Sequence, residues 1–180
     1  MKVFSAAQIK AWDQFTIKNE PIASIDLMER ASSVFTKRFY KLYDADFKVL
    51  IFAGTGNNGG DGLAIARMLH QNGYDVEAVI CGEPENGSED FKTNLKRAGN
   101  QGIKIISAED FEFEKTSEKS VIIDAIFGNG LNRKIEGFFA EIIKKINKSN
   151  IEVVAVDFPS GVFCDNLNQD EVKIIANYTL

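Results

Sequence analysis

The chain has 180 residues, 44% of them hydrophobic, which suits one compact domain with one core. Its formal net charge is -5 and its isoelectric point is near 5.0, and it lacks the clustered Lys and Arg that a nucleic-acid partner would require. The N-terminus has no apolar stretch of signal-peptide length, and no 18-residue apolar run occurs. Cys81 and Cys164 show no metal-ligand spacing, so neither a zinc site nor a disulfide framework is predicted. We expect a cytoplasmic chain without membrane contact.

Two amphipathic helices are predicted before the first strand. Residues 5–19 begin with Ser5 and Gln8 at capping-box spacing and carry an apolar face. Residues 24–43 repeat apolar side chains every three or four positions. These helices predict an N-terminal helical extension ahead of the sheet.

Short runs rich in Val, Ile and Leu predict the strands, and helical patterns separate several of them. The predicted strands are residues 48–54, 75–82, 104–107, 120–128, 151–161 and 177–180. The helical patterns between them cover residues 61–73, 86–102 and 136–149. Near-continuous apolar strands that alternate with helices are typical of a parallel sheet covered on both faces. The sequence therefore predicts an α/β fold, a Rossmann-like doubly wound and mostly parallel sheet with an N-terminal helical extension, in a single domain.

Polar, glycine-rich segments follow three of the predicted strands. They are GTGNNGGDG at residues 54–62, DAIFGNGLNRK at 124–134 and DFPSG at 157–161. Ligands of open parallel sheets bind beyond the carboxyl ends of the strands, at the point where the strand order reverses. We therefore expect the three segments to converge on one crevice.

The glycine pattern of residues 54–59 matches Gly-x-Gly-x-x-Gly between a strand and a helix, the context of a dinucleotide fingerprint. Glu83 lies where a ribose-binding acid would be expected, so a nicotinamide dehydrogenase is one alternative. Against it, the chain has a single histidine, His70, and no second domain for a substrate. A Walker P-loop is excluded because no Gly-Lys-Ser/Thr follows the glycines. A structural interpretation is also open, since Gly, Asn and Asp serve tight turns and helix caps.

The three segments together supply oxygen ligands. Asn58 offers an amide oxygen, Asp124 a carboxylate and Ser160 a hydroxyl, while the neighbouring glycines expose backbone carbonyls. Such oxygens suit an alkali or alkaline-earth cation rather than zinc. The amides near Gly60 and Asp61, at the expected start of the helix, would suit a phosphate.

Four blocks of the sequence together resemble the NAD(P)H-hydrate epimerase family, the YjeF N-terminal domain. They are IDLMERAS, GTGNNGGDGLAIARML, DAIFGNGLNR and VDFPSG, they occur in the family's order, and the resemblance covers nearly the whole chain. It implies a Rossmann-like isomerase that interconverts the R and S epimers of hydrated NADH and NADPH (NADHX and NADPHX). It also implies a role in repairing these nucleotides.

The resemblance further implies which residues form the site. A potassium ion would be bound by Asn58, Asp124 and Ser160, with backbone carbonyls from the 128–134 loop. The substrate would contact residues from all three segments. These are Asn57, Asn58, Gly59, Gly60, Asp61, Gly128, Asn129, Gly130, Leu131, Asn132, Arg133, Lys134 and Asp157.

Four positions leave alternatives open. Thr55 stands where the family often has Pro, and Asn129 where Thr is frequent; neither change removes a proposed ligand. Arg133 and Lys134 would reach the substrate's phosphates as point charges or form a solvated basic edge. Either cation could instead pair with Asp124.

Asp157 is the candidate catalytic residue. The reacting carbon bears a hydroxyl and the ring nitrogen, so its C–O bond can break with help from the nitrogen lone pair, and water can add back to the other face. A carboxyl that protonates the leaving hydroxyl and then accepts a proton from water would suffice. The alternative role for Asp157 is a turn cap, because Pro159 and Gly161 follow it.

The resemblance also implies partners. A dehydratase would repair one of the two epimers, and the family continues past residue 180, so we expect residues 1–180 to be truncated or one piece of a bifunctional epimerase–dehydratase. A homodimer is expected as well, with Trp12 and Phe15 as contacts to the core or to a second copy. A non-catalytic nucleotide-binding or scaffold module of the same fold is the alternative. The residues that favour an enzyme are Asn58, Asp61, Asp124, Asp157 and Ser160.

Overall fold

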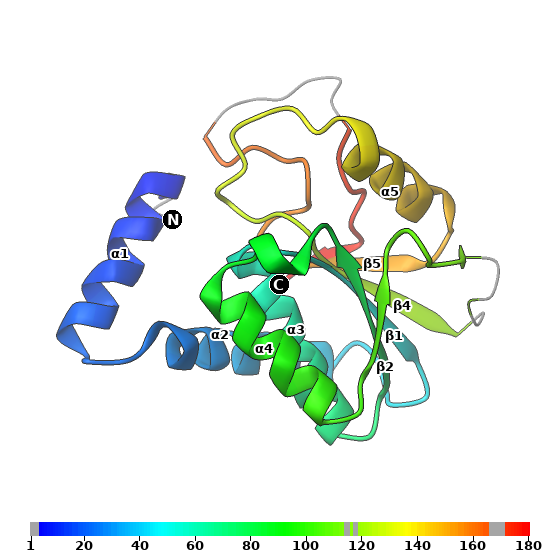
Figure 1. The fold of residues 1–180 in the computed structure, drawn as a ribbon, viewed down its shortest axis with the longest axis horizontal. Coiled ribbons are helices and arrows are strands. Elements are labelled where there is room, and N and C mark those ends of the chain that lie inside the picture. Colours follow the sequence, from blue (N-terminus) through cyan, green and yellow to red (C-terminus); the bar gives the residue numbers. More distant parts are fainter. Residues whose placement is uncertain (1–3, 114–115, 117–118, 166–171) are drawn as a thin grey trace.

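The structure is a computed structural model that describes residues 4–113, 116, 119–165 and 172–180. Its strands form one sheet in the order β3-β2-β1-β4-β5-β6, and every pairing is parallel (Figure 1). The strands are β1 (Lys48–Gly54), β2 (Asp75–Cys81), β3 (Lys104–Ser107), β4 (Ser120–Ala125), β5 (Glu152–Ala155) and β6 (Tyr178–Thr179). The predicted Rossmann-like α/β fold is confirmed, and all the described strands are parallel rather than most of them.

Helices cover both faces of this sheet. They are α1 (Ala6–Asn19), α2 (Ser24–Phe39), α3 (Asn57–Gln71), α4 (Glu89–Asn100) and α5 (Gly137–Lys148), with a short 3-10 turn, η1 (Pro84–Asn86). Successive side chains of β1 point to opposite faces: Val49 and Ile51 pack with α2, α3 and α4, whereas Leu50 and Phe52 pack on the side of α5. Two hydrophobic cores therefore enclose the sheet (Figure 1). No helix among the described residues is long and apolar enough to cross a membrane.

The N-terminal extension is smaller than the sequence predicts. Phe35 and Phe39 of α2 are buried in the same core as α3, so α2 belongs to the main helical layer. Only α1 stands apart, to the left in Figure 1, and none of its residues is buried. A helix without a buried face owes its position to its caps and to the loops at its ends.

The start of α1 agrees with the sequence, but its apolar face does not pack on the core. Ser5 and Gln8 form the predicted capping box, in which each side chain accepts a hydrogen bond from the other residue's backbone N–H. Trp12 and Phe15 are 57% and 65% exposed, so the prediction that they contact the core is wrong. Their contact with a second copy stays a prediction.

β4 and β5 end earlier than predicted, and an acidic residue explains the end of each strand. After β4, the N–H of Ile126 donates to a carboxylate oxygen of Asp124 at 3.2 Å instead of continuing the ladder. After β5, Asp157 adopts a left-handed backbone with φ of 64°, which turns the chain away from the sheet. Both loops therefore leave the sheet at its carboxyl edge, close to their acidic residues.

Candidate active site

The three polar segments converge at the carboxyl ends of β1, β4 and β5, as predicted. β1 is the switch point, because β2 and β3 lie on one side of it and β4, β5 and β6 on the other. A cavity of about 720 Å³ opens there, between the start of α1, the start of α3 and the 126–133 loop; we call it the loop cavity. A second cavity of about 830 Å³ lies between α1, α2 and α3; we call it the helix cavity. Both are lined by Lys10, Asp13, Asn57, Asp61, Asn129 and Asp157.

The glycine-rich turn is shorter than expected, because α3 already begins at Asn57. A Cβ on Gly59 would lie 1.6 Å from the carbonyl oxygen of Gly54, so glycine is required for the helix to start this close to the strand. The N–H of Gly60 donates to the carbonyl of Gly56 at 3.1 Å, so this amide is part of the helix ladder. The N–H groups left for an anion are therefore those of the first turn, starting at Asn57, and not that of Gly60.

Asp124 and Ser160, two of the predicted cation ligands, are buried at the carboxyl edge of the sheet and line neither cavity. The Ser160 backbone N–H and hydroxyl both donate to the Asp124 carboxylate, at 2.7 and 2.6 Å, and the Ser160 hydroxyl accepts from the N–H of Phe127 at 2.8 Å. Asp124 is fully buried, and no Lys or Arg of the described residues pairs with it, so the suggested pairing with Arg133 or Lys134 is absent. Burial raises the pKa of Asp124 to about 6, against the effect of the Ser160 and Ile126 hydrogen bonds.

A small cation would fit the chemistry of this buried pair. A buried carboxylate without a cationic partner carries a desolvation cost that a bound cation would offset. The amide nitrogen of Asn58 is buried and has no hydrogen-bond partner among the described residues. A Cβ on Gly128 would lie 3.2 Å from Asn58 Cγ, so this amide borders the 126–133 loop. No group of three or more His, Cys, Asp or Glu side chains suited to a metal occurs in the described part of the chain. The donors are thus single oxygens of mixed type, which suits an alkali cation.

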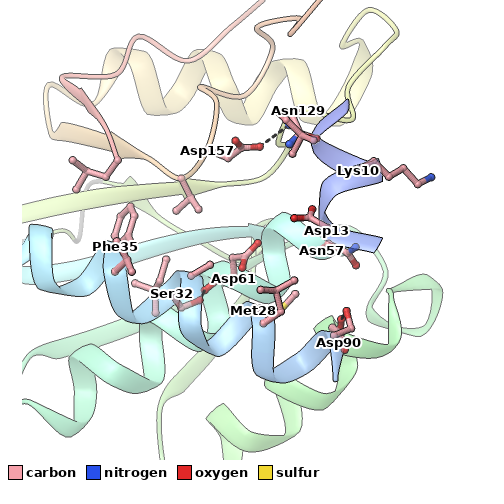
Figure 2. A pocket seen from close by; sticks show the side chains of 18 of the residues that line it. Lys10, Asp13, Met28, Ser32, Phe35, Asn57, Asp61, Asp90, Asn129 and Asp157 are labelled. Carbon is pink, nitrogen blue, oxygen red and sulfur yellow. Dashed lines mark hydrogen bonds between the residues drawn. The ribbon is translucent and has the colours of Figure 1, made fainter. Parts of the chain in front are cut away.

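Asp157 links two of the loops. Its carboxylate accepts a hydrogen bond from the backbone N–H of Asn129 at 2.9 Å (Figure 2), and both residues border both cavities. Burial raises the pKa of Asp157, the Asn129 hydrogen bond lowers it, and the negative charge of Asp13 raises it. The hydrogen bond goes to the loop after β4 and not to the turn of residues 157–161, so Asp157 is more than a local turn cap.

Asp61 occupies the junction of the two cavities. It projects from α3 toward the open space on the side where Asp157 lies (Figure 2). Burial and the negative charges of Asp157, Asp13 and Asp90 together raise the pKa of Asp61 to about 7. A carboxyl with a pKa near neutrality is suited to give and take protons.

The structure brings most of the expected substrate residues to the loop cavity. Those that line it are Asn57, Asn58, Asp61, Gly128, Asn129, Gly130, Leu131, Asn132, Arg133 and Asp157. Gly59, Gly60 and Lys134 line neither cavity, so their contact with substrate stays a prediction. Glu83 is exposed and also lies outside both cavities, which removes the ribose-binding acid of the dehydrogenase alternative.

Sequence reasoning missed the contribution of α1. Lys10 and Asp13 border both cavities, although neither belongs to a glycine-rich segment. Their spacing of three residues places them on one side of the helix, and this spacing was the only feature of the sequence that could have linked them. Nothing in the sequence indicated that this side would face the site.

Comparison with known proteins agrees with this site. The family model for the YjeF-related protein N-terminus matches residues 24–180. The chain belongs to this family. The match starts at the first residue of α2, so α1 lies outside it.

Proteins similar to this chain carry names that refer to NAD(P)H hydrates. An NAD(P)H-hydrate epimerase of Limosilactobacillus fermentum is 42% identical over 99% of this chain and 84% of its own length. One of Oenococcus oeni is 39% identical over 91% of this chain and 77% of its own length. A bifunctional NAD(P)H-hydrate repair enzyme of Thermofilum pendens is 33% identical over the whole chain, which matches 35% of that enzyme. The crystal structure of yeast ynu0, YNL200c, has the same fold, with a TM-score of 0.86, 24% identity, and coverage of 99% of this chain and 79% of that one.

Proposed function

We propose that this YjeF-family protein is an NAD(P)H-hydrate epimerase, which interconverts the R and S epimers of NADHX and NADPHX. The observation that carries the proposal is the position of Asp157. Its carboxylate accepts a hydrogen bond from the Asn129 amide and borders both cavities at the switch point of the sheet. The names of relatives that match nearly the whole chain support the same reaction.

The loop cavity suits the phosphates of a dinucleotide. The backbone N–H groups in the first turn of α3, starting at Asn57, lie at the positive end of the helix dipole and would favour a bound anion. Lys10 and Arg133 line the same cavity and add positive charge. A substrate bound in this way would extend from the loop cavity toward Asp157 at the junction.

Asp157 would act as the acid and base of the reaction. Its pKa is raised by burial, which favours a protonated form able to donate to the leaving hydroxyl. The Asn129 hydrogen bond then favours the ionised form that accepts a proton from entering water. Loss of water leaves a planar iminium that the ring nitrogen stabilises.

The fold family implies a potassium ion, and Asn58, Asp124 and Ser160 would hold it. A bound cation supplies positive charge that offsets the buried Asp124 carboxylate. Asp124 and Ser160 would fix the start of the two loops that carry Asn129 and Asp157. Their contribution is therefore to position the loops and not to react.

The activity test measures how fast the purified R epimer of NADHX equilibrates with the S epimer in potassium buffer. The wild type should accelerate this, and Asp157→Asn should lose about 10²- to 10⁴-fold while keeping its fold. Asp75→Asn is the matched control, because Asp75 is exposed at the amino end of β2, away from the site. Full activity of Asp157→Asn would remove Asp157 from the catalytic role. No acceleration by the wild type would favour a non-catalytic module.

The proposed enzyme would work with two kinds of partner. A dehydratase that accepts one epimer would consume the product, and one relative is named a bifunctional NAD(P)H-hydrate repair enzyme. A second copy of this chain would cover the exposed Trp12 and Phe15 of α1. Light scattering tests the second proposal: Phe15→Arg should convert a dimer to a monomer, and an unchanged mass would contradict it.

A further inference from the structure

Epimerisation places a geometric demand on the site. The hydroxyl leaves one face of the ring, and water must enter from the opposite face. A single carboxyl beside one face can assist only one of these two proton transfers unless the ring turns over while bound. An enzyme that holds the ring still needs a proton donor or acceptor on each face.

The structure holds two carboxyls that meet this demand. Asp157 comes from the loop after β5, Asp61 comes from the second turn of α3, and both border both cavities. In Figure 2 the Asp61 carboxylate points from its helix toward the side from which Asp157 approaches, with the cavity between them. The Asp61 side chain makes no hydrogen bond or ion pair with the residues that the structure describes, so no contact of this kind holds it away from the cavity.

We propose that Asp61 is a second catalytic acid and base, which serves the ring face opposite to Asp157. This inference rests on the proposed epimerase function and adds to it a catalytic residue and a stereochemical course. The sequence predicts Asp61 as a substrate contact, and this inference gives it a catalytic role as well. The two carboxyls exchange roles between the forward and reverse reactions.

The step balances in atoms and electrons. The Asp61 carboxyl gives its proton to the hydroxyl, the C–O bond breaks with its electron pair on oxygen, and water leaves. The ring nitrogen lone pair forms the C=N bond of the iminium. A water molecule then bonds to the same carbon from the other face, and the Asp157 carboxylate takes its proton. The reverse reaction begins with the proton on Asp157 and ends with it on Asp61.

The charges around the pair favour one shared proton. The groups that face Asp61 are Asp13 of α1, Asp90 of α4 and Asp157, all acidic, while the Lys10 amine points away from the helix cavity (Figure 2). Burial and the repulsion of these groups raise the pKa of Asp61 to about 7. Burial also raises the pKa of Asp157, but the hydrogen bond from the Asn129 amide opposes this and favours its ionised form. Environments that separate two carboxyls in this way assign one as acid and the other as base.

The test follows oxygen exchange and inversion separately, in water enriched in ¹⁸O and after subtraction of the uncatalysed rates. Each purified epimer of NADHX is incubated with wild type, Asp61→Asn, Asp157→Asn or Asp75→Asn. Asp75→Asn is the matched control, because it removes an exposed carboxylate at the amino end of β2, outside both cavities. Thermal unfolding of each variant verifies its fold.

The wild type and Asp75→Asn should invert both epimers and exchange their hydroxyl oxygen. Asp61→Asn should lose inversion by about 10²- to 10⁴-fold yet still exchange the epimer whose hydroxyl faces Asp157. Asp157→Asn should exchange only the other epimer. A purely structural role for either residue would not produce this opposite selectivity.

Two outcomes would overturn the inference while leaving the epimerase function intact. If Asp61→Asn inverts both epimers at the wild-type rate, Asp157 works alone. If folded Asp61→Asn loses exchange of both epimers together with inversion, Asp61 binds the substrate without serving one face. A wild type that accelerates neither process would overturn the epimerase function itself.

Discussion

Ser160 binds Asp124 twice, through its backbone N–H at 2.7 Å and its hydroxyl at 2.6 Å. Asp124 is the fifth residue of β4, and Ser160 lies in the loop after β5. The pair therefore joins the carboxyl end of β4 to the loop after β5. Because Asp124 is fully buried, these bonds supply much of the compensation for its charge. The order of both loops therefore depends on this contact.

Ser160→Ala should lower the free energy of unfolding by about 1–3 kcal/mol, because it removes the hydroxyl that binds both the Asp124 carboxylate and the Phe127 amide. Urea unfolding followed by circular dichroism measures this. Ser107→Ala, at an exposed end of β3, is the control and should change stability by about 0.5 kcal/mol or less. Equal effects of the two variants would contradict the role of the contact.

Potassium should raise the melting temperature at constant ionic strength, because a ligand that binds only the folded state stabilises it. Differential scanning fluorimetry in potassium, sodium and tetramethylammonium chloride measures the shift. Asp124→Asn should abolish the difference between the salts, since the amide lacks the charge that a cation offsets. An undiminished potassium shift in Asp124→Asn would place the cation elsewhere.

Gly59→Ala should prevent folding or strongly destabilise the protein. The added Cβ would lie 1.6 Å from the carbonyl oxygen of Gly54, so β1 and α3 could not keep their present separation. Gly56→Ala adds the same atom three residues earlier, where nothing lies within 4 Å. Soluble expression and melting temperature compare the two, and a stable Gly59→Ala protein would show that the strand and helix can separate.

The stability of the protein should fall as the pH rises from about 4 to about 7, in part because of Asp61. Its pKa is raised from 3.8 in the unfolded chain to about 7 in the fold, so the folded state holds this proton more tightly. Below that range the carboxyl is protonated in both states, and above it the fold carries the cost of the buried charge.

The difference between wild type and Asp61→Asn isolates this effect, because Asp13, Asp90 and Asp157 face the site in both proteins. Urea unfolding at about pH 5 and about pH 8 should show that Asp61→Asn gains stability relative to the wild type at the higher pH. A difference that does not change with pH would contradict the raised pKa.

The sheet and the meeting point of its loops could be predicted from the sequence because parallel strands have a simple signature. Apolar runs of β-branched residues marked the strands, and their polar ends marked the crevice that Asn58 and Asp157 line. The strand ends could not be predicted. Asp124 binds the Ile126 amide and Asp157 takes a positive φ, and neither feature follows from hydrophobic patterning.

The helices show a second limit of sequence patterns. The spacing of apolar residues predicted α1 and α2 equally, yet Phe39 of α2 is fully buried whereas Trp12 of α1 is mostly exposed. Periodicity reports that a helix has an apolar face, but tertiary packing decides what that face meets. For the same reason the sequence could not place Asp13 beside Asp61.

α1 lies outside the family match, buries none of its residues and yet walls both cavities. Mutations at Lys10 or Asp13 would therefore change what the site accepts at little cost to the fold, because no core packing depends on them. Evolution can adjust ligand selectivity here without passing through unstable intermediates. The same freedom makes α1 the natural segment to randomise when a library is built to alter which nucleotide the protein accepts.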